Sequence, residues 1–136
     1  MEIKTKNMLT ESELNELSGK IISAAIEVHR ELGPGLLESV YEYCFFEELV
    51  NRGLSVRKQV QLPIIYKGNI LEKDFFIDLL VDDEIIIEIK AIDILLPVHE
   101  VQLVTYLKLA DKRLGLLINF NVPRLVEGIR RKVNKL

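Results

Sequence analysis

The sequence has 136 residues, of which 49% are hydrophobic and 29% charged, and its formal net charge at neutral pH is −3. The length suits a single domain over residues 1–136, and the interleaving of apolar with charged residues excludes an intrinsically disordered chain. The negative balance excludes the strongly basic overall field of many nucleic-acid-binding proteins, although a local basic surface remains compatible with it.

The chain has one cysteine, Cys44, which excludes an intrachain disulfide and predicts a reducing, cytoplasmic location. The first residues, MEIKTKNMLTESE, contain no apolar run of signal-peptide length. No stretch approaches about 18 consecutive apolar residues, so we expect no membrane span. A loose, polar lead-in is predicted for residues 1–10.

Two helices are predicted in the first part of the chain. From Thr10 onward, apolar residues recur at helical spacing, and Thr10 with Glu13 matches a capping box. This helix should end near Leu32, because Gly33-Pro34-Gly35 interrupts it. A second helix is predicted over residues 36–52, where a glycine follows at the position that favours helix termination.

Three strands are predicted next, at residues 56–66, 70–81 and 84–91. A Lys-Gly-Asn connection joins the first pair, and an Asp-Asp turn joins the second pair. The third strand contains the segment IIIEIKA, which is so apolar that we expect it to be central and buried on both faces.

The last part of the chain predicts a crossover unit. A helix over residues 97–110, with proline in its first turn, is followed by a strand over residues 113–120. A strand, a helix and a further strand in this order favour parallel pairing of the two strands, with a right-handed connection. The residues after Pro123 are predicted to form a short basic helix. The element order therefore indicates an α/β fold.

The stretch FFIDLLVDDEIIIEIKA places charged side chains within otherwise apolar strands. Glu88 and Lys90 are two residues apart, so they project from the same face of one strand. A hairpin turning at Asp82-Asp83 would place Asp78 on the neighbouring strand, where its carboxylate could converge with that of Glu88. Two buried carboxylates are costly unless a partner compensates their charge, and Mg²⁺ does so well. The pattern predicts a divalent-metal site, with Lys90 beside it to stabilise charge or orient a water.

A structural interpretation of these strands remains open. Glu88 and Lys90 could form an ion pair on one strand, while Asp78 caps the adjacent hairpin. Glu38 and Glu42 lie one turn apart on the second predicted helix, and the default interpretation of each is a surface acid.

The predicted helix over residues 97–110 carries a polar stripe. His99, Gln102 and Tyr106 share one face, because they are three and four residues apart. Such a stripe is unexpected on a helix that packs against a buried strand, so it indicates either a site or an ordinary solvated face. We do not predict His99 as a metal ligand.

Several segments together resemble a known family. The segment GLLESVY at residues 35–41 matches the GxxExxY signature, which names a family of small bacterial and archaeal proteins in the PD-(D/E)xK nuclease superfamily. The resemblance continues through DLLV, IIIEIKA, LLPVHEVQLVTYLKL and GLLINFNVP, so it covers nearly the whole chain. It implies a restriction-endonuclease-like α-β-β-β-α-β core, with a four-stranded mixed sheet flanked by helices.

The resemblance also implies roles for individual residues. Asp78 and the Glu88-x-Lys90 tripeptide stand at the active-site positions of the superfamily. The two acids would be metal ligands, and Lys90 would be the catalytic lysine. Glu38 matches an acid contributed by the first core helix and is therefore a candidate third metal ligand.

Two further positions on the helix match the superfamily, and two strand positions depart from it. Gln102 and Tyr106 match a QxxxY motif that supports the active site or the nucleic acid in nucleases resembling recombination exonucleases. Ile77 stands before the acid in place of proline. Phe76 occupies a position where many relatives carry a basic residue, so one phosphate or site contact is missing.

These observations predict a metal-dependent nuclease, with DNA favoured over RNA as its substrate and Mg²⁺ or Mn²⁺ as its cofactor. The alternatives are a catalytically inactive module of the same fold, which binds nucleic acid or a protein partner, and a structural oligomerisation protein. We also consider a homodimer, since a small domain often needs a second subunit to span a duplex. A phosphate-binding face, or else a solvated terminal helix, is predicted from Arg124, Arg130, Arg131 and Lys132.

Overall fold

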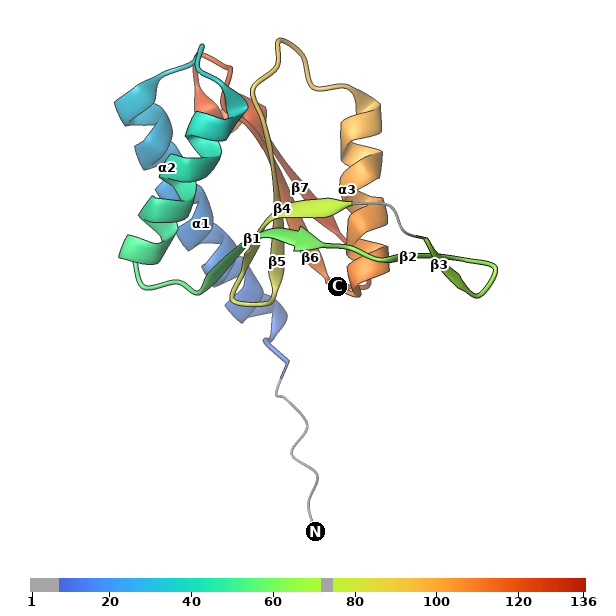
Figure 1. Ribbon diagram of the computed structural model, residues 1–136. Helices are drawn as coiled ribbons and strands as arrows, with labels where there is room; N and C mark the ends of the chain where they lie inside the picture. The colour runs from blue at the N-terminus through green and yellow to red at the C-terminus, as the bar shows by residue number, and fades with distance from the viewer. Residues whose placement is uncertain (1–7, 72–74) are drawn as a thin grey trace.

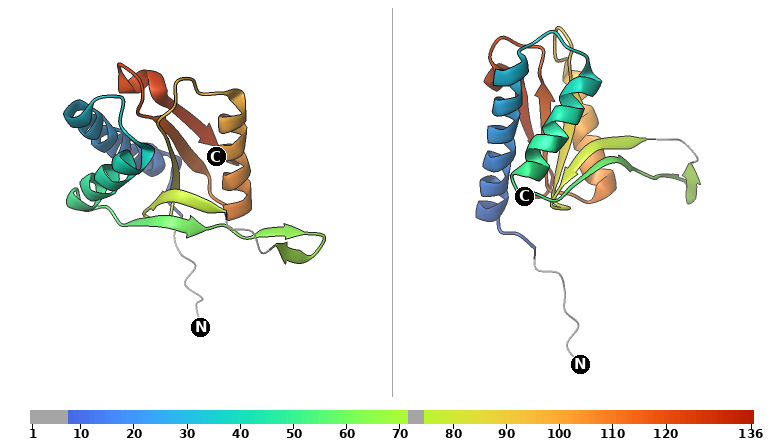
Figure 2. Two further views of the ribbon diagram at one scale, coloured as in Figure 1. Left: turned by 45° about the horizontal axis from the view of Figure 1, so that its top comes forward. Right: turned by 60° about the vertical axis from the view of Figure 1, so that its left-hand side comes forward.

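The chain folds as a mixed sheet with helices on both faces (Figure 1). The computed structural model describes residues 8–71 and 75–136. Helices α1 (Glu11–Leu32) and α2 (Glu38–Asn51) cover one face of the sheet, and α3 (Pro97–Ala110) covers the other, as the turned views also show (Figure 2). The predicted α/β class is confirmed. Among the described helices, none combines the length and apolarity that crossing a membrane requires.

Local signals define the ends of the first helix. The Thr10 side chain accepts a hydrogen bond from the Glu13 backbone N–H, and the Glu13 carboxylate accepts one from the Thr10 backbone N–H. The helix ends at Gly33, whose φ of +68° is unfavourable for residues with side chains. The predicted helix therefore forms with its predicted cap. Most of the lead-in predicted for residues 1–10 lies outside the described residues.

Within residues 8–71 and 75–136, the main sheet has five strands, one more than predicted. In spatial order they are β1 (Val56–Gln61), β4 (Phe76–Val81), β5 (Ile85–Lys90), β6 (Leu114–Asn119) and β7 (Ile129–Val133). Strands β5 and β6 are parallel, whereas the other pairs are antiparallel. Since α3 connects β5 to β6, the predicted crossover unit is confirmed.

The prediction of a basic helix after Pro123 is wrong. A short 3-10 helix, η1 (Leu125–Gly128), leads into β7, which pairs antiparallel with β6. Pairing with β7 satisfies the backbone of β6, which would otherwise form an open sheet edge, and this outweighs the local helix propensity. Gly128 allows the chain to return closely, because a Cβ atom there would lie 2.2 Å from the backbone oxygen of Asn119.

The strands predicted at 56–66 and 70–81 are each interrupted. Beyond β1, the chain forms a separate two-stranded hairpin from β2 (Ile64–Tyr66) and β3 (Asn69–Leu71). Pro63 separates β1 from β2, since proline has no N–H to donate to a strand partner. Part of the second prediction, residues 72–74, lies outside the described residues. Figures 1 and 2 show this hairpin projecting beyond α3.

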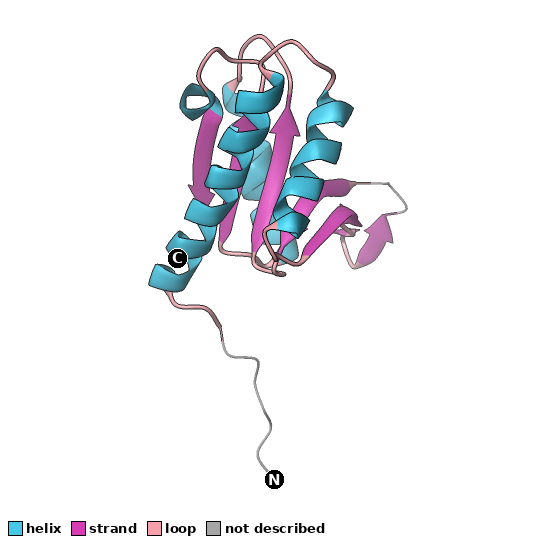
Figure 3. Cartoon of the chain, turned by 90° about the vertical axis from the view of Figure 1, so that its left-hand side faces the viewer, coloured by secondary structure: helices cyan, strands magenta, loops and turns pink. Residues whose placement is uncertain are grey.

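The core forms two layers, one on each side of the sheet. Figure 3 looks onto the side where α1 and α2 lie in front of the strands. On the α1 and α2 side, the rings of Tyr41 and Phe120 stack with their centroids 4.8 Å apart. On the α3 side, Leu103 packs in a smaller cluster with Ile86 and Leu117. Strand β5 contributes side chains to both layers, which explains why it is apolar on both faces and confirms the prediction of a buried central strand.

Candidate functional site

The sheet opens between β4 and β5 where the two acidic residues lie. The two strands pair only from Leu79 opposite Ile87 to Val81 opposite Ile85. Beyond that point, β4 continues beside β1 and β5 continues beside β6. We call this opening, with the side chains of Asp78 and Glu88 in it, the β4–β5 fork.

The two carboxylates replace the missing hydrogen bonds between the strands. The Asp78 backbone N–H donates to Glu88 Oε1 at 3.2 Å, and the Ile89 backbone N–H donates to Asp78 Oδ2 at 2.8 Å. Each acid therefore occupies one carboxylate oxygen with the backbone of the opposite strand. The structure brings Asp78 and Glu88 together across the hairpin, and both carboxylates are held in place by main-chain donors.

A bend in the β1–β4 ribbon accompanies the fork. Gln59 lies opposite Asp78 on β1 and has a φ of +51°, which is unusual within a strand. Residues two apart normally share a face, yet Leu79 packs toward α1 and α2, whereas Ile77 packs with the α3 cluster. The ribbon therefore turns at Asp78, which separates β4 from β5 and leaves room for the two carboxylates.

Burial and charge perturb Glu88. The residue is only 6% exposed. Burial, followed by the charge of Asp78 and a hydrogen bond shared with that side chain, raises the pKa of its carboxyl group to about 9, against the opposing effects of the Asp78 N–H and the Lys90 ammonium. Without a cation, Glu88 is therefore protonated at neutral pH. A divalent cation fits this pair of oxygen donors, because it would replace the proton and neutralise both carboxylates.

Lys90 ends β5 and is partly buried. Its ammonium group lies close enough to Glu88 and Glu38 to lower the pKa of each carboxyl group against the larger effect of burial. The structure therefore places the cation beside the acids of the site, although no direct ion pair of Lys90 is present among the described residues. This position suits a group that stabilises negative charge at the fork.

Asn119 braces the chain after Lys90, a role that the sequence interpretation missed. It is 1% exposed and lies opposite Lys90 on β6. Its Nδ2 donates to the Ile92 carbonyl at 2.9 Å, while its Oδ1 accepts from the backbone N–H groups of Ile92 at 3.1 Å and Asn121 at 3.2 Å. A lone polar residue at the end of the apolar segment GLLIN is the only signal in the sequence that indicates it.

Helix α2 contributes two acids from the other side of the fork. Partial burial raises the pKa of Glu38 and that of Glu42, and the charge of Asp78 adds to both increases. Glu42 Oε1 also accepts a hydrogen bond from Gln59 Nε2 at 2.6 Å. The structure therefore adds Glu42 and Gln59 to the surroundings of Asp78, whereas the sequence interpretation had chosen Glu38 alone on this helix.

Helix α3 contributes a hydrogen-bonded pair. Gln102 Nε2 donates to the Tyr106 hydroxyl at 2.9 Å. Burial, followed by the charge of Glu88, raises the pKa of Tyr106. The third residue of the predicted stripe, His99, instead accepts a hydrogen bond from the Leu96 N–H at the start of the helix. Gln102 and Tyr106 thus face the site region, whereas His99 caps the start of the helix.

The described residues contain no ready-made metal cage. Among them, no three His, Cys, Asp or Glu side chains come together in a way that could hold an ion. Asp78 and Glu88 form a two-residue donor set, and Glu38 lies near enough to sense the charge of Asp78 without completing a cluster. The donor chemistry of the fork fits a hard cation, which often keeps several waters as its remaining ligands.

The basic residues near the C-terminus do not form one face. Lys132 makes an ion pair with Glu100 on α3 at 2.6 Å, whereas Arg131 bonds to Asn15 on α1 at 2.7 Å. Arg130 donates to the carbonyls of Glu127 and Ile129. Arg124 is exposed at the start of η1. The basic side chains of β7 are therefore divided between the two faces of the sheet.

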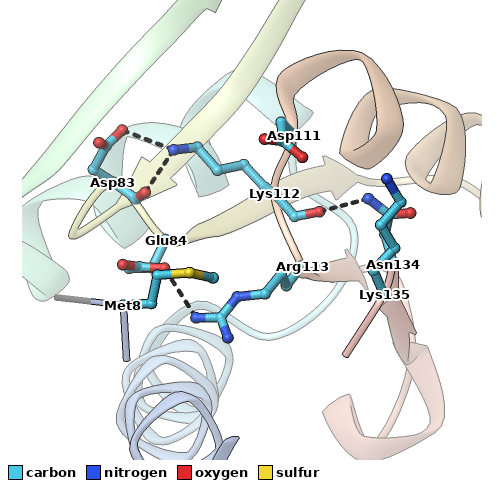
Figure 4. A pocket seen from close by; sticks show the side chains of 8 residues that line it. All are labelled: Met8, Asp83, Glu84, Asp111, Lys112, Arg113, Asn134 and Lys135. Carbon is cyan, nitrogen blue, oxygen red and sulfur yellow. Dashed lines mark hydrogen bonds and ion pairs between the residues drawn. The ribbon is translucent and has the colours of Figure 1, made fainter. Parts of the chain in front are cut away.

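A concave surface also lies at the opposite end of β5 (Figure 4). This cavity of about 390 Å³ is lined by basic and acidic side chains that engage one another. Lys112 Nζ donates to the Asp83 carbonyl at 2.8 Å, and Arg113 pairs with Glu84 at 3.7 Å. Because β5 begins at Ile85 beside this cavity and ends at Lys90, the cavity is separate from the β4–β5 fork.

Comparison with known proteins points to one superfamily. The sequence profile of the PD-(D/E)XK nuclease superfamily matches residues 15–132. No curated protein and no solved structure matches the chain. The matched span extends from the first turns of α1 into β7 and includes the fork, α2 and α3.

Proposed function

Because the chain belongs to the PD-(D/E)XK nuclease superfamily, we propose that it is a divalent-metal-dependent nuclease that hydrolyses phosphodiester bonds in DNA rather than RNA. The observation that carries this proposal is the fork, where Asp78 and Glu88 are cross-bonded to the backbone and Glu88 is buried and protonated without a cation. Two converging carboxylates beside a lysine suit the chemistry of charged phosphate groups.

Each residue at the fork then has a distinct role. Asp78 and Glu88 would hold Mg²⁺ or Mn²⁺, with Glu38 as a further ligand from α2. The bound ion would activate a water and neutralise charge that develops on the phosphate. Glu88 gives up its proton when the cation binds. The Lys90 ammonium stabilises the negative charge of the reacting phosphate, and the Asn119 contacts hold the chain that follows Lys90 in place.

The remaining assignments concern the substrate and the family. We place Gln102 and Tyr106 beside the reacting strand, as a hydrogen-bonded pair on α3. Because they do not form one face, Arg124, Arg130, Arg131 and Lys132 would contact phosphates separately, away from the cleavage point, and Lys132 would do so once its ion pair with Glu100 is exchanged for nucleic acid. We further assign the chain to the GxxExxY family, as one cytoplasmic domain.

A homodimer remains a prediction that sedimentation equilibrium would test.

A second candidate function is a nuclease-fold module that binds nucleic acid or a protein without cleaving. The observation that favours it is the incomplete donor set, since the described residues offer no cluster of three metal-binding side chains. Calorimetric titration with Mg²⁺ and DNA, combined with a cleavage assay, distinguishes the two functions. Binding without turnover supports the module.

The first experiment compares cleavage of single- and double-stranded DNA and RNA in Mg²⁺ or Mn²⁺ by the wild type and by Lys90→Ala. We expect cleavage that requires the metal and falls at least about 100-fold in the variant. Lys20→Ala is the matched control, because Lys20 is exposed on α1. Full metal-dependent cleavage by Asp78→Ala would contradict the assignment of the fork, and no cleavage by pure wild type would favour the binding module.

A further inference from the structure

An aromatic ring lies exposed on β4 beside the fork. Phe76 is 40% exposed and precedes Asp78 by two residues. It belongs to neither buried cluster of the described core, and its ring pairs with no other described aromatic ring. The core phenylalanines Phe45 and Phe120, by contrast, are fully buried and in contact. The position of Phe76 therefore needs an explanation other than core packing.

The pairing of the ribbon shows which way Phe76 faces. On this part of the ribbon, Ile77 and its partner Val60 pack with the α3 cluster. Because neighbouring residues of a strand project to opposite faces, Phe76 and its partner Gln61 face away from α3. Gln59, which lies between the β1 partners of Ile77 and Leu79, bonds to Glu42 of α2, so the position of Asp78 is also on the side away from α3. An exposed ring, an exposed amide and the acid of the site thus occupy one face of the ribbon.

The spacing matches a nucleic-acid strand bound at the fork. Residues two apart on a strand are separated by about 6.5 Å, so a base attached next to a phosphate at Asp78 would reach the ring of Phe76. Aromatic side chains stack on the face of any base, and an amide such as that of Gln61 offers both a donor and an acceptor to base edges. In a duplex, stacked neighbouring bases cover these faces.

We propose that Phe76 is a stacking platform for an unpaired base, so that the substrate of the fork is single-stranded DNA. This inference rests on the proposed nuclease function, because the fork positions the strand. Phe76 contributes to binding and alignment and takes no part in bond cleavage. Gln61 contacts the edge of the stacked base. An aromatic platform of this kind accepts all four bases, so cleavage is expected with little sequence preference.

Kinetics of side-chain variants provide the first test. Phe76→Leu keeps an apolar side chain but removes the ring, and we expect the KM for a single-stranded oligonucleotide to rise about tenfold with kcat nearly unchanged. Phe76→Tyr keeps an aromatic ring and should therefore have the KM of the wild type. Tyr43→Leu is the matched control, because Tyr43 is 64% exposed and lies on the solvent side of α2, opposite the buried Tyr41 and Phe45. A KM for Phe76→Leu equal to that of the wild type would overturn the inference.

Fluorescence provides a second test that does not depend on catalysis. The chain contains no tryptophan, so Phe76→Trp introduces a unique reporter at the proposed platform. In a Lys90→Ala background, where the strand is not consumed, single-stranded DNA should quench this tryptophan through stacking, and a blunt duplex should quench it much less. A tryptophan introduced by Tyr43→Trp should respond to neither. Equal quenching by duplex, or none by the single strand, would overturn the inference.

The two tests separate this inference from the proposed function. If Phe76→Leu cleaves single-stranded DNA with an unaltered KM, the stacking role of Phe76 is contradicted, whereas the proposed nuclease function is still supported. If single-stranded DNA quenches Phe76→Trp but the wild type cleaves no substrate, the stacking role of Phe76 is supported and the proposed nuclease function is contradicted. Stronger quenching by single-stranded RNA than by DNA overturns the choice of DNA.

Discussion

Metal binding at the β4–β5 fork should release a proton, and the number released follows from the burial of Glu88. Its pKa of about 9 means that the carboxyl group is protonated at neutral pH. At pH 7, two pH units below that value, only about 1% of the molecules carry the ionised carboxylate. A divalent cation requires the ionised form, so binding should displace close to one proton.

The same reasoning sets the pH dependence of the affinity. Between pH 6 and about pH 9, the apparent association constant for Mn²⁺ should rise about tenfold for each pH unit, and it should level off above that range. At pH 7 the affinity should be about 100-fold weaker than at full ionisation. Glu38 adds proton release of the same sign, since partial burial raises its pKa as well.

Isothermal titration calorimetry measures this release directly. Titrations of Mn²⁺ at pH 7, in two buffers with different ionisation enthalpies, give the number of protons from the slope of the heat against buffer enthalpy. Glu88→Gln should lose both the binding and the release, while Glu47→Gln, at an exposed acid elsewhere on α2, should retain them. Tight binding by the wild type with no proton release, or an affinity independent of pH, would refute the reasoning.

Other predictions concern stability. Burial raises the folded-state pKa of Glu88 from 4.5 to about 9, so its stabilising contribution is fully present below about pH 4.5 and is lost as the pH rises toward 9. In EDTA, the Tm of the wild type should therefore fall more steeply over this range than that of Glu88→Gln, and parallel profiles would contradict this. Asn119→Ala should reduce the free energy of unfolding by about 1–3 kcal/mol, because the Ile92 N–H and carbonyl lose their partner; urea denaturation should show a smaller loss for Asn121→Ala. Gly128→Ala should destabilise by at least about 3 kcal/mol, since its Cβ would meet the Asn119 oxygen at 2.2 Å. In Gly19→Ala, where no atom lies within 4 Å, a gain of roughly 0.5–1 kcal/mol is expected, and equal effects at the two glycines would be inconsistent with the close approach.

Signals that act over a few residues were sufficient to predict the local structure. The capping box of Thr10 and Glu13 formed as expected, and Gly33 ended the helix. The turn at Asp82-Asp83 also formed, with both residues at positive φ and a hydrogen bond from the Glu84 N–H to the Val81 carbonyl. These features depend on neighbouring residues alone, so their sequence patterns are informative without the rest of the fold.

The sequence by itself also determined which charged residues could meet. Glu88 and Lys90 share a face because a strand repeats every two residues, and the hairpin turn places Asp78 opposite Glu88. Their catalytic and metal-binding roles remain predictions. The apolar composition of β5 likewise indicated burial on both faces, since no polar side was available for solvent.

Only the tertiary structure decided how the sheet is completed and where it opens. Strand β7 forms because the edge of β6 needs a partner, which a local pattern of arginine and lysine does not reveal. The fork depends on the bend at Gln59, where β4 stays beside β1 and separates from β5. Asn119 holds Ile92 in place, although the two residues are 27 positions apart in the chain. Such contacts join residues that are distant in sequence, so their geometry follows from sheet twist and packing rather than from the periodicity of any one segment.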